Sequence, residues 1–247
     1  MNDRLCVFCL TICLVPLVVC AQDAPPPGKQ VEQTFKTSDG ADVGYLLYLP
    51  KNFEHDGEKM PMVLFLHGRG ESNGPLSLVA KWGPPRFAQN GDELPYVLVS
   101  PQCPKEDFWS SETQQQRITE LVDAIVEKYA VDQNRLYLTG LSMGGFGSWR
   151  MAADQPKRFA AVAPVCGRGD AADGEKLKDI PIWVFHGNDD RVVPYQNSVD
   201  MVQAIKQAGG TKVRFTSLEH IGHNSWSSAY ATPELYQWML DQKLSSE

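Results

Sequence analysis

The chain has 247 residues, 43% of them hydrophobic, which is enough to bury the core of one α/β domain or of two small ones. Its formal net charge is −7, and lysine and arginine form no cluster anywhere in the sequence. An acidic surface repels phosphate backbones, so the composition argues against a nucleic-acid partner.

The first 21 residues have the pattern of a signal peptide. Residues 5–20 are almost wholly apolar, follow Arg4 and end in the small-residue pattern Val19-Cys20-Ala21. Because this run is too short for a membrane span, we expect cleavage after Ala21, export, and no stable membrane insertion. A lipid anchor on Cys20 is the alternative, ranked second because Val19 is bulky for a bacterial lipobox. Residues 22–29, which contain three consecutive prolines, then form an extended leader to a domain of residues 30–247.

The cysteines do not form a disulfide scaffold, because four of the six lie inside the expected signal peptide. Cys103 and Cys166 remain in the mature chain. Export would permit a bridge between them. We expect two buried free thiols instead.

From residue 30 onward, apolar runs typical of strands alternate with helical patterns. The spacing of Ile118, Leu121, Val122 and Ile125 indicates an amphipathic helix, and Ser111 with Gln114 fits a capping box at its start. Such alternation predicts a mostly parallel sheet of about eight strands with helices on both faces. The strands expected in chain order are 43–49, 62–66, 96–100, 135–139, 160–163, 182–185 and 213–218; the helices expected are 112–130, 146–153, 195–208 and one beginning at Thr232-Pro233.

The pentapeptide Gly140-Leu141-Ser142-Met143-Gly144 follows the strand expected at 135–139 and precedes a helix. Gly-x-Ser-x-Gly in this context is the nucleophile elbow of serine hydrolases. The glycines relieve crowding in a sharp turn, and the serine then stands above a helix N-terminus, whose amides stabilise an oxyanion. Ser142 is therefore the predicted nucleophile.

A serine hydroxyl needs a base and an orienting acid, which in hydrolases with this elbow follow the serine in the order acid, then histidine. His223 comes after a flexible turn near the end of the chain, so we prefer it as the base over His220, which we expect to pack in the loop. His67 and His186 end strands, where we expect them to bond the backbone. The acid belongs in the loop after the strand at 182–185, where Asp189 and Asp190 compete; composition does not separate them.

Five motifs in order resemble a known family. The sequence is similar to secreted α/β-hydrolase serine esterases that include polyhydroxybutyrate-depolymerase-like, feruloyl and acetylxylan esterases, with a likeness to dienelactone hydrolases and to proteins called predicted peptidases. The likeness covers residues 30–240. The motifs are His67-Gly68-Arg69-Gly70-Glu71, Pro101-Gln102-Cys103-Pro104, Gly140 to Gly147, His186-Gly187-x-x-Asp190-x-x-Val193-Pro194, and Gly222-His223-Asn224-Ser225-Trp226.

This resemblance implies the site. Its motif leaves two residues between Gly187 and the acid, which selects Asp190. The implied triad is Ser142, Asp190 and His223, and the implied oxyanion donors are the backbone N–H groups of Arg69 and Met143. The Arg69 side chain is not needed for that role and is a candidate for substrate contact. The implied activity is carboxylic-ester hydrolysis through an acyl-enzyme, on small-molecule esters or esters attached to plant polysaccharides or polymers, with no cofactor.

Hydrolases of this architecture often carry a cap after the strand expected at 160–163, but the sequence leaves room for none there, so we expect an open site. The alternatives are a serine peptidase of the prolyl-oligopeptidase type and a non-catalytic binding module. A metal site at His220, His223, Glu219 and the two aspartates is a weaker hypothesis, because the triad already explains these residues. Trp109 and Trp226 are candidates for sugar or aryl contact, although packing is their more common role.

Overall fold

The computed structural model describes residues 25–245, so the expected signal peptide and residues 22–24 of the leader lie outside the described residues. The eight strands are β1 (Gln30–Lys36), β2 (Asp42–Tyr48), β3 (Met60–Leu66), β4 (Val97–Pro101), β5 (Val131–Leu141), β6 (Ala161–Val165), β7 (Ile182–Gly187) and β8 (Val213–Leu218). The α-helices are α1 (Gly83–Asn90), α2 (Glu112–Lys128), α3 (Met143–Asp154), α4 (Gly174–Leu177), α5 (Gln196–Gln207), α6 (Trp226–Tyr230) and α7 (Pro233–Leu240); short 3-10 turns are η1 (Arg69–Glu71), η2 (Leu76–Lys81) and η3 (Ala171–Asp173).

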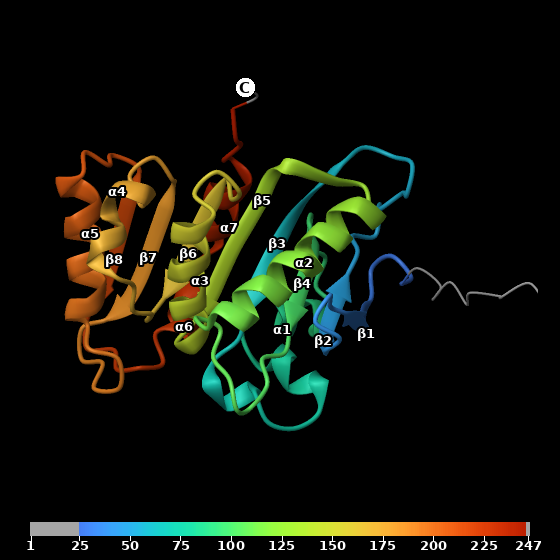
Figure 1. Cartoon of the computed structure of the whole chain (residues 1–247), viewed down its shortest axis with the longest axis horizontal. Coiled ribbons are helices and arrows are strands. Elements are labelled where there is room, and N and C mark those ends of the chain that lie inside the picture. The colour runs from blue at the N-terminus through green and yellow to red at the C-terminus, as the bar shows by residue number, and fades with distance from the viewer. Residues whose placement is uncertain (1–24, 246–247) are drawn as a thin grey trace, which may run out of the picture.

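All eight strands form one sheet in the order β1-β2-β4-β3-β5-β6-β7-β8. The pairs β1–β2 and β2–β4 are antiparallel, and every pair from β4 to β8 is parallel. Figure 1 shows the twisted sheet with α2, α3 and α5 in front of it and α1, α6 and α7 behind it. The α/β fold with a mostly parallel sheet of eight strands is therefore confirmed.

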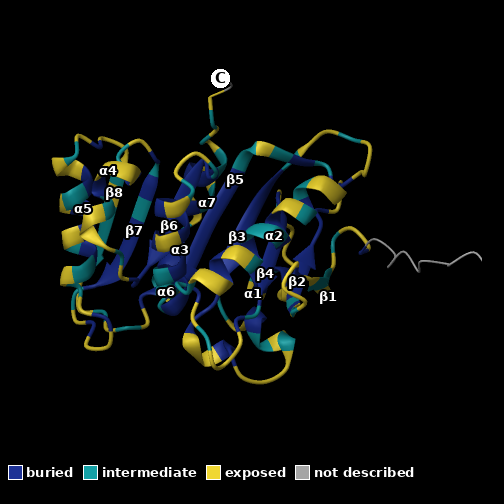
Figure 2. Cartoon of the chain, in the orientation of Figure 1, coloured by how far each residue is buried: buried dark blue, intermediate teal, exposed yellow. Residues whose placement is uncertain are grey.

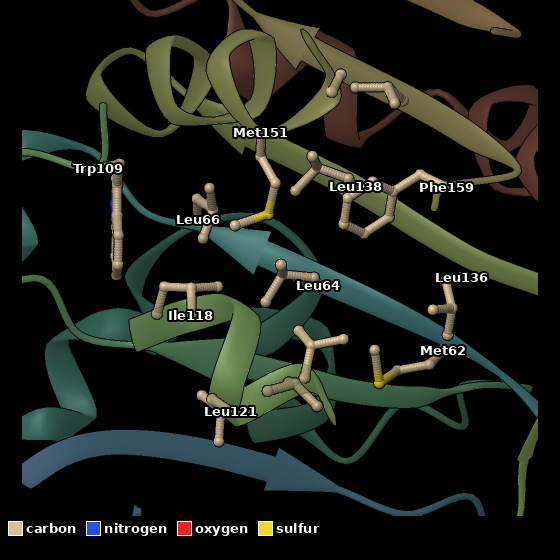
Figure 3. Close-up of a cluster of buried hydrophobic side chains, with 14 of the residues drawn as sticks. Met62, Leu64, Leu66, Trp109, Ile118, Leu121, Leu136, Leu138, Met151 and Phe159 are labelled. Atoms are coloured by element: carbon tan, nitrogen blue, oxygen red, sulfur yellow. The ribbon is translucent and has the colours of Figure 1, made fainter. Parts of the chain in front are cut away.

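The apolar runs are continuous because both faces of the sheet are covered. On β3, Met62, Leu64 and Leu66 pack on one face with side chains from α2 and α3, as Figure 3 shows for Ile118, Leu121 and Met151. The alternating residues Val63 and Phe65 pack on the other face with side chains from α1 and α7. In Figure 2 the central strands are accordingly buried, while the outer sides of the helices are exposed.

Four strands and helices were not expected from the sequence: β1, α1, α6 and α4, which has only four residues. β1 carries polar residues on its exposed side at the edge of the sheet, so it has no apolar run. α1 begins with Gly83-Pro84-Pro85, which looks like a loop, although proline is tolerated in the first turn of a helix. α6 has only five residues, too few for a periodic pattern.

Only one of the two hydrogen bonds of the predicted capping box forms. The Ser111 hydroxyl accepts a hydrogen bond from the backbone N–H of Gln114, as expected at the start of α2. The Gln114 amide, however, donates to a carboxylate oxygen of Asp107 at 2.9 Å instead of returning to Ser111. A charged acceptor is the stronger partner, so this bond replaces the reciprocal arm.

The segment between β6 and β7 holds only η3 and α4, so no cap domain is inserted there, as expected. Cys103 and Cys166 are both buried free thiols, which confirms the prediction against a bridge. Within residues 25–245, no helix combines the length and the apolar character needed to cross a membrane.

The start of α3 lies in direct contact with the backbone of the neighbouring strands. A Cβ atom on Gly144 would lie 1.9 Å from the carbonyl oxygen of Leu66 at the end of β3. A Cβ on Gly145 would lie 2.7 Å from the carbonyl oxygen of Val165 at the end of β6. Only glycine permits this approach, which places the helix N-terminus at the centre of the sheet.

We therefore expect Gly144→Ala to lower the free energy of unfolding by about 3 kcal/mol, because the backbone of Leu66 and His67 at the end of β3 must move. Urea unfolding followed by circular dichroism measures this loss. Gly70→Ala is the matched control, since a Cβ there meets nothing within 4 Å. Equal stability of the two variants would contradict the close approach.

Candidate active site

The carboxyl ends of the parallel strands bring the predicted triad residues together. Ser142 directly follows β5, Asp190 is the third residue after the end of β7, and His223 lies in the loop after β8. Because β5, β6, β7 and β8 are neighbours and parallel, these ends meet at one edge of the sheet. Side chains 33 to 81 residues apart in sequence thus come into hydrogen-bond contact.

Ser142 has the strained backbone expected of a nucleophile elbow. Its φ is 52° and its ψ is −115°, a conformation that non-glycine residues rarely adopt. The Ser142 N–H donates to the carbonyl of Val165 at 2.9 Å, and the Phe146 N–H donates to the carbonyl of Ser142 at 3.1 Å. These two bonds hold the serine between β6 and the first turn of α3.

A hydrogen-bonded relay connects the three side chains. The Ser142 hydroxyl lies 2.9 Å from Nε2 of His223, and Nδ1 of His223 lies 2.7 Å from Oδ2 of Asp190. A carboxylate only accepts, so Nδ1 carries the proton and Nε2 presents its lone pair to the hydroxyl. In this tautomer His223 is able to take a proton from Ser142.

The carboxylate of Asp190 is buried, and the backbone of its own loop donates hydrogen bonds to it. Its Oδ1 accepts the backbone N–H groups of Val192 and Val193 at 2.8 and 2.9 Å. Burial alone raises the pKa of Asp190, but the hydrogen bonds from His223, Val193 and Val192 outweigh it and hold this pKa below its ordinary value. The carboxyl is therefore ionised.

Asp189, which composition alone did not separate from Asp190, is exposed and has its backbone N–H bonded to the Ile221 carbonyl.

His186 also contacts Asp190, a contact that was not expected from the sequence. Its Nε2 faces both Oδ2 of Asp190 at 3.1 Å and the carbonyl of Val193 at 3.0 Å. Two acceptors require an N–H, so Nε2 carries the proton and Nδ1 accepts from the Ser198 hydroxyl at 2.7 Å. Burial lowers the pKa of His186, so the ring is neutral. The expected backbone bond is present, through Val193; the bond to the acid was not predictable from the motif.

The metal hypothesis based on His220 is not supported by its position. His220 is exposed, with a φ of 59°, and its backbone N–H donates to the side-chain oxygen of Asn188. Among the described residues, the ligand-type atoms that gather within 4.8 Å belong to Cys166, Asp190 and His223. Two of these three already share a proton in the relay.

The two candidate oxyanion donors lie at the starts of helical turns. Met143 is the first residue of α3 and Arg69 is the first residue of η1, where backbone N–H groups have no acceptor within the helix. The Arg69 side chain is occupied by the protein: its guanidinium donates to the carbonyls of Lys105 and Asp107 and lies 4.4 Å above the ring of Phe108. This structural role was not expected from the sequence, and the suggested contact of the exposed Arg69 side chain with substrate stays a prediction.

The loop that carries Arg69 is held by buried polar groups. His67 accepts the N–H of Cys103 at Nε2 and contacts the carbonyl of Gly68 at Nδ1, and burial lowers its pKa to about 4, so it is neutral. Trp109 is 1% exposed, and its indole N–H donates to the His67 carbonyl, so packing is its role. Trp226 remains half-buried beside His223.

Comparisons with known proteins agree with this architecture. Residues 95–232 match the family described as phospholipase/carboxylesterase. The bifunctional acetylxylan esterase/xylanase XynS20E of Neocallimastix patriciarum is 26% identical over 66% of this chain and 23% of its own length. The probable acetylxylan esterase A of Aspergillus terreus is 26% identical over 91% of this chain and 88% of its own length.

Among solved structures, a thermostable esterase superposes with a TM-score of 0.77 at 35% identity, covering 87% of this chain. The match spans 63% of that esterase, and the chain spans about a quarter of the Neocallimastix protein, so both are longer than the part they share with it. The family match covers more than half of the sequence and includes Ser142 and Asp190. The chain belongs to the phospholipase/carboxylesterase family and has the α/β-hydrolase fold.

Proposed function

We propose that this protein hydrolyses carboxylic esters, with Ser142 as nucleophile, His223 as general base and Asp190 as the acid that orients it. The observation that carries the proposal is the relay from the Ser142 hydroxyl through both ring nitrogens of His223 to a buried carboxylate, at 2.9 and 2.7 Å. These are hydrogen-bond distances, so the hydroxyl is aligned for proton transfer before substrate binds.

The chemistry follows from this alignment. The Ser142 oxygen attacks the ester carbonyl while Nε2 of His223 takes its proton, and Asp190 stabilises the imidazolium. The backbone N–H groups of Met143 and Arg69 are placed to receive the negative charge on the carbonyl oxygen. His223 then protonates the alcohol oxygen, the alcohol leaves, and water repeats the cycle to release the acid.

For the substrate, we propose esters attached to plant polysaccharides or other polymers. Two observations support this class: relatives named acetylxylan esterase match the chain, and the segment between β6 and β7 adds no cap above the site. We also propose that residues 1–21 are a signal peptide and that the enzyme is exported, since polymeric substrates lie outside the cell.

Ser142→Ala should abolish hydrolysis of p-nitrophenyl esters and labelling by a fluorophosphonate probe, because no other group would attack the carbonyl. The serine is half-exposed at a turn, so the thermal midpoint should be nearly unchanged. Peptide amides assayed beside the esters distinguish the peptidase alternative. Labelling of the variant at the wild-type rate would refute the assignment of the nucleophile.

Asp190→Asn should lower kcat by on the order of 10⁴, as expected when the tautomer of the base is no longer held. Asp189→Asn should change kcat less than about threefold, because that carboxylate is exposed and outside the relay. His223→Ala should likewise lower kcat far more than His220→Ala does. Steady-state kinetics on the four variants measures this, and a larger loss at position 189 or 220 would overturn the mapping.

His186→Phe should lower kcat by about ten- to a hundredfold at similar KM, because the Asp190 carboxylate loses a hydrogen bond that fixes its orientation toward His223. With one donor fewer on Asp190, the carboxylate stabilises imidazolium at His223 more strongly, so the apparent pKa of the acidic limb of kcat/KM should rise. Ser198→Ala is the control, since two acceptors still hold the proton on Nε2 of His186. An unchanged pH profile in a folded His186→Phe protein would show that the histidine only packs.

A further inference from the structure

Cys166 lies beside the proposed catalytic relay, and the mechanism above does not use it. It is the first residue after β6, its side chain is completely buried, and its φ of 40° is a conformation that residues other than glycine rarely adopt. Its backbone N–H donates to the carbonyl of Phe185 in β7 at 2.8 Å. Backbone strain of this kind gathers at functional sites, so this thiol is a candidate for a role of its own.

The sulfur of Cys166 completes a group of three metal-ligand atoms. This sulfur, a carboxylate oxygen of Asp190 and a ring nitrogen of His223 all lie within 4.8 Å of one another. Within residues 25–245, no other three cysteine, histidine or acidic side chains bring their ligand atoms together in this way. Thiolate, imidazole and carboxylate are the ligands that bind Zn²⁺ in proteins.

The charges balance when a divalent ion enters this group. Burial raises the pKa of the Cys166 thiol to about 12, so the thiol is neutral in the free protein. A bound metal ion removes the proton from a thiol that coordinates it. One thiolate, the Asp190 carboxylate and Zn²⁺ then sum to zero charge, which removes the main cost of placing an ion in a buried site.

The protein already holds the carboxylate as a metal ligand is held. Two backbone N–H groups fix Oδ1 of Asp190, and His186 donates to Oδ2, as the outer partners of metal-binding carboxylates do. Zinc bond lengths of about 2.0 to 2.3 Å place two ligand atoms about 3.3 to 3.6 Å apart. Nδ1 of His223 and Oδ2 of Asp190, which are 2.7 Å apart, must therefore separate slightly, while the sulfur comes closer by about 1 Å. The His223 side chain is partly exposed, so the ion has a path past its ring.

We propose that Cys166, Asp190 and His223 bind a zinc ion, and that this ion switches the hydrolase off. The inference rests on the proposed ester hydrolysis, because the ion acts on the same relay. Zinc takes the place of the proton between Nδ1 of His223 and Asp190; that proton moves to Nε2, and the thiol proton leaves to solvent. A protonated Nε2 has no lone pair for the Ser142 hydroxyl, so the serine is no longer activated.

Inhibition of p-nitrophenyl acetate hydrolysis is the first test. Zn²⁺ should inhibit the wild-type enzyme, and EDTA should restore its activity. Cys166→Ala and Cys166→Ser should each raise the inhibition constant at least about a hundredfold, because even the outer partners of a bound metal contribute about ten- to a hundredfold. Each constant is measured against the uninhibited rate of the same variant.

Cys103→Ala and His220→Ala are the matched controls. Cys103 is the other buried free thiol, and burial raises its pKa to about 12 as well, but it is outside the three-ligand group. His220 is in the same loop as His223, but it is exposed and is also outside the group. Both variants should keep the wild-type inhibition constant.

A spectroscopic titration separates this inference from the proposed function. Cd²⁺ binds soft ligands as zinc does, and its bond to a thiolate gives a charge-transfer band in the ultraviolet. Ser142→Ala protein, which should not hydrolyse esters, should show this band with one ion bound per chain. Adding Cys166→Ala should remove the band, whereas adding Cys103→Ala should leave it unchanged.

The outcomes distinguish the two proposals. If esters are hydrolysed but zinc inhibits both Cys166 variants as strongly as the wild type, the metal site is overturned and the hydrolase stands. Absence of the cadmium band, or its loss with Cys103→Ala instead of Cys166→Ala, also overturns the site. If no ester is hydrolysed, the proposed function fails, and the cadmium band still decides whether the three side chains bind a metal.

Discussion

The contact between the start of α3 and the backbone of β3 and β6 is the constraint on which the rest of the site depends. The chain passes from β5 to α3 through a single residue, Ser142, which takes up a strained conformation. The strain persists because Gly144 and Gly145 let backbone atoms meet where any side chain would collide. The same packing places the N-terminus of α3, with its free N–H groups, beside the serine hydroxyl. Nucleophile and oxyanion donor are thus positioned by one contact.

The site also depends on the buried carboxylate of Asp190. A buried charge is costly unless it is fully hydrogen-bonded, and here two backbone N–H groups and two imidazoles surround it. The two histidines differ in exposure and therefore in chemistry. His186 is completely buried and neutral, so it is a fixed donor, whereas His223 is partly exposed and is bonded to Ser142. Because both donate to Oδ2, a change at His186 reaches His223 through a single oxygen atom.

Much of this arrangement could be predicted from the sequence, for physical reasons that also explain the failures. Strands buried on both faces must be continuous apolar runs, so β3 and β7 were located within their bounds, whereas the edge strand β1 is half polar and left no such signal. The glycines around Ser142 are a local requirement and are visible as a motif. The second partner of Asp190 is not local, because it depends on how the loop after β7 folds back over His186. The conformation of that loop also buries Asp190 and exposes Asp189. Because the two residues are adjacent and identical, the sequence does not indicate which of them is buried.

The oxyanion loop shows how a short segment is held rigid without regular structure. η1 has only three residues, and its anchors come from residues 102–109: the Arg69 guanidinium binds two carbonyls there, and Gln102 donates to the Glu71 carbonyl at 2.8 Å. Burial raises the pKa of Glu71 even with the Lys81 ammonium 3.8 Å away, so this carboxyl is placed at some electrostatic cost. That cost is understandable if the loop must be ordered before substrate arrives, since an oxyanion donor that has to be arranged during the reaction loses most of its effect.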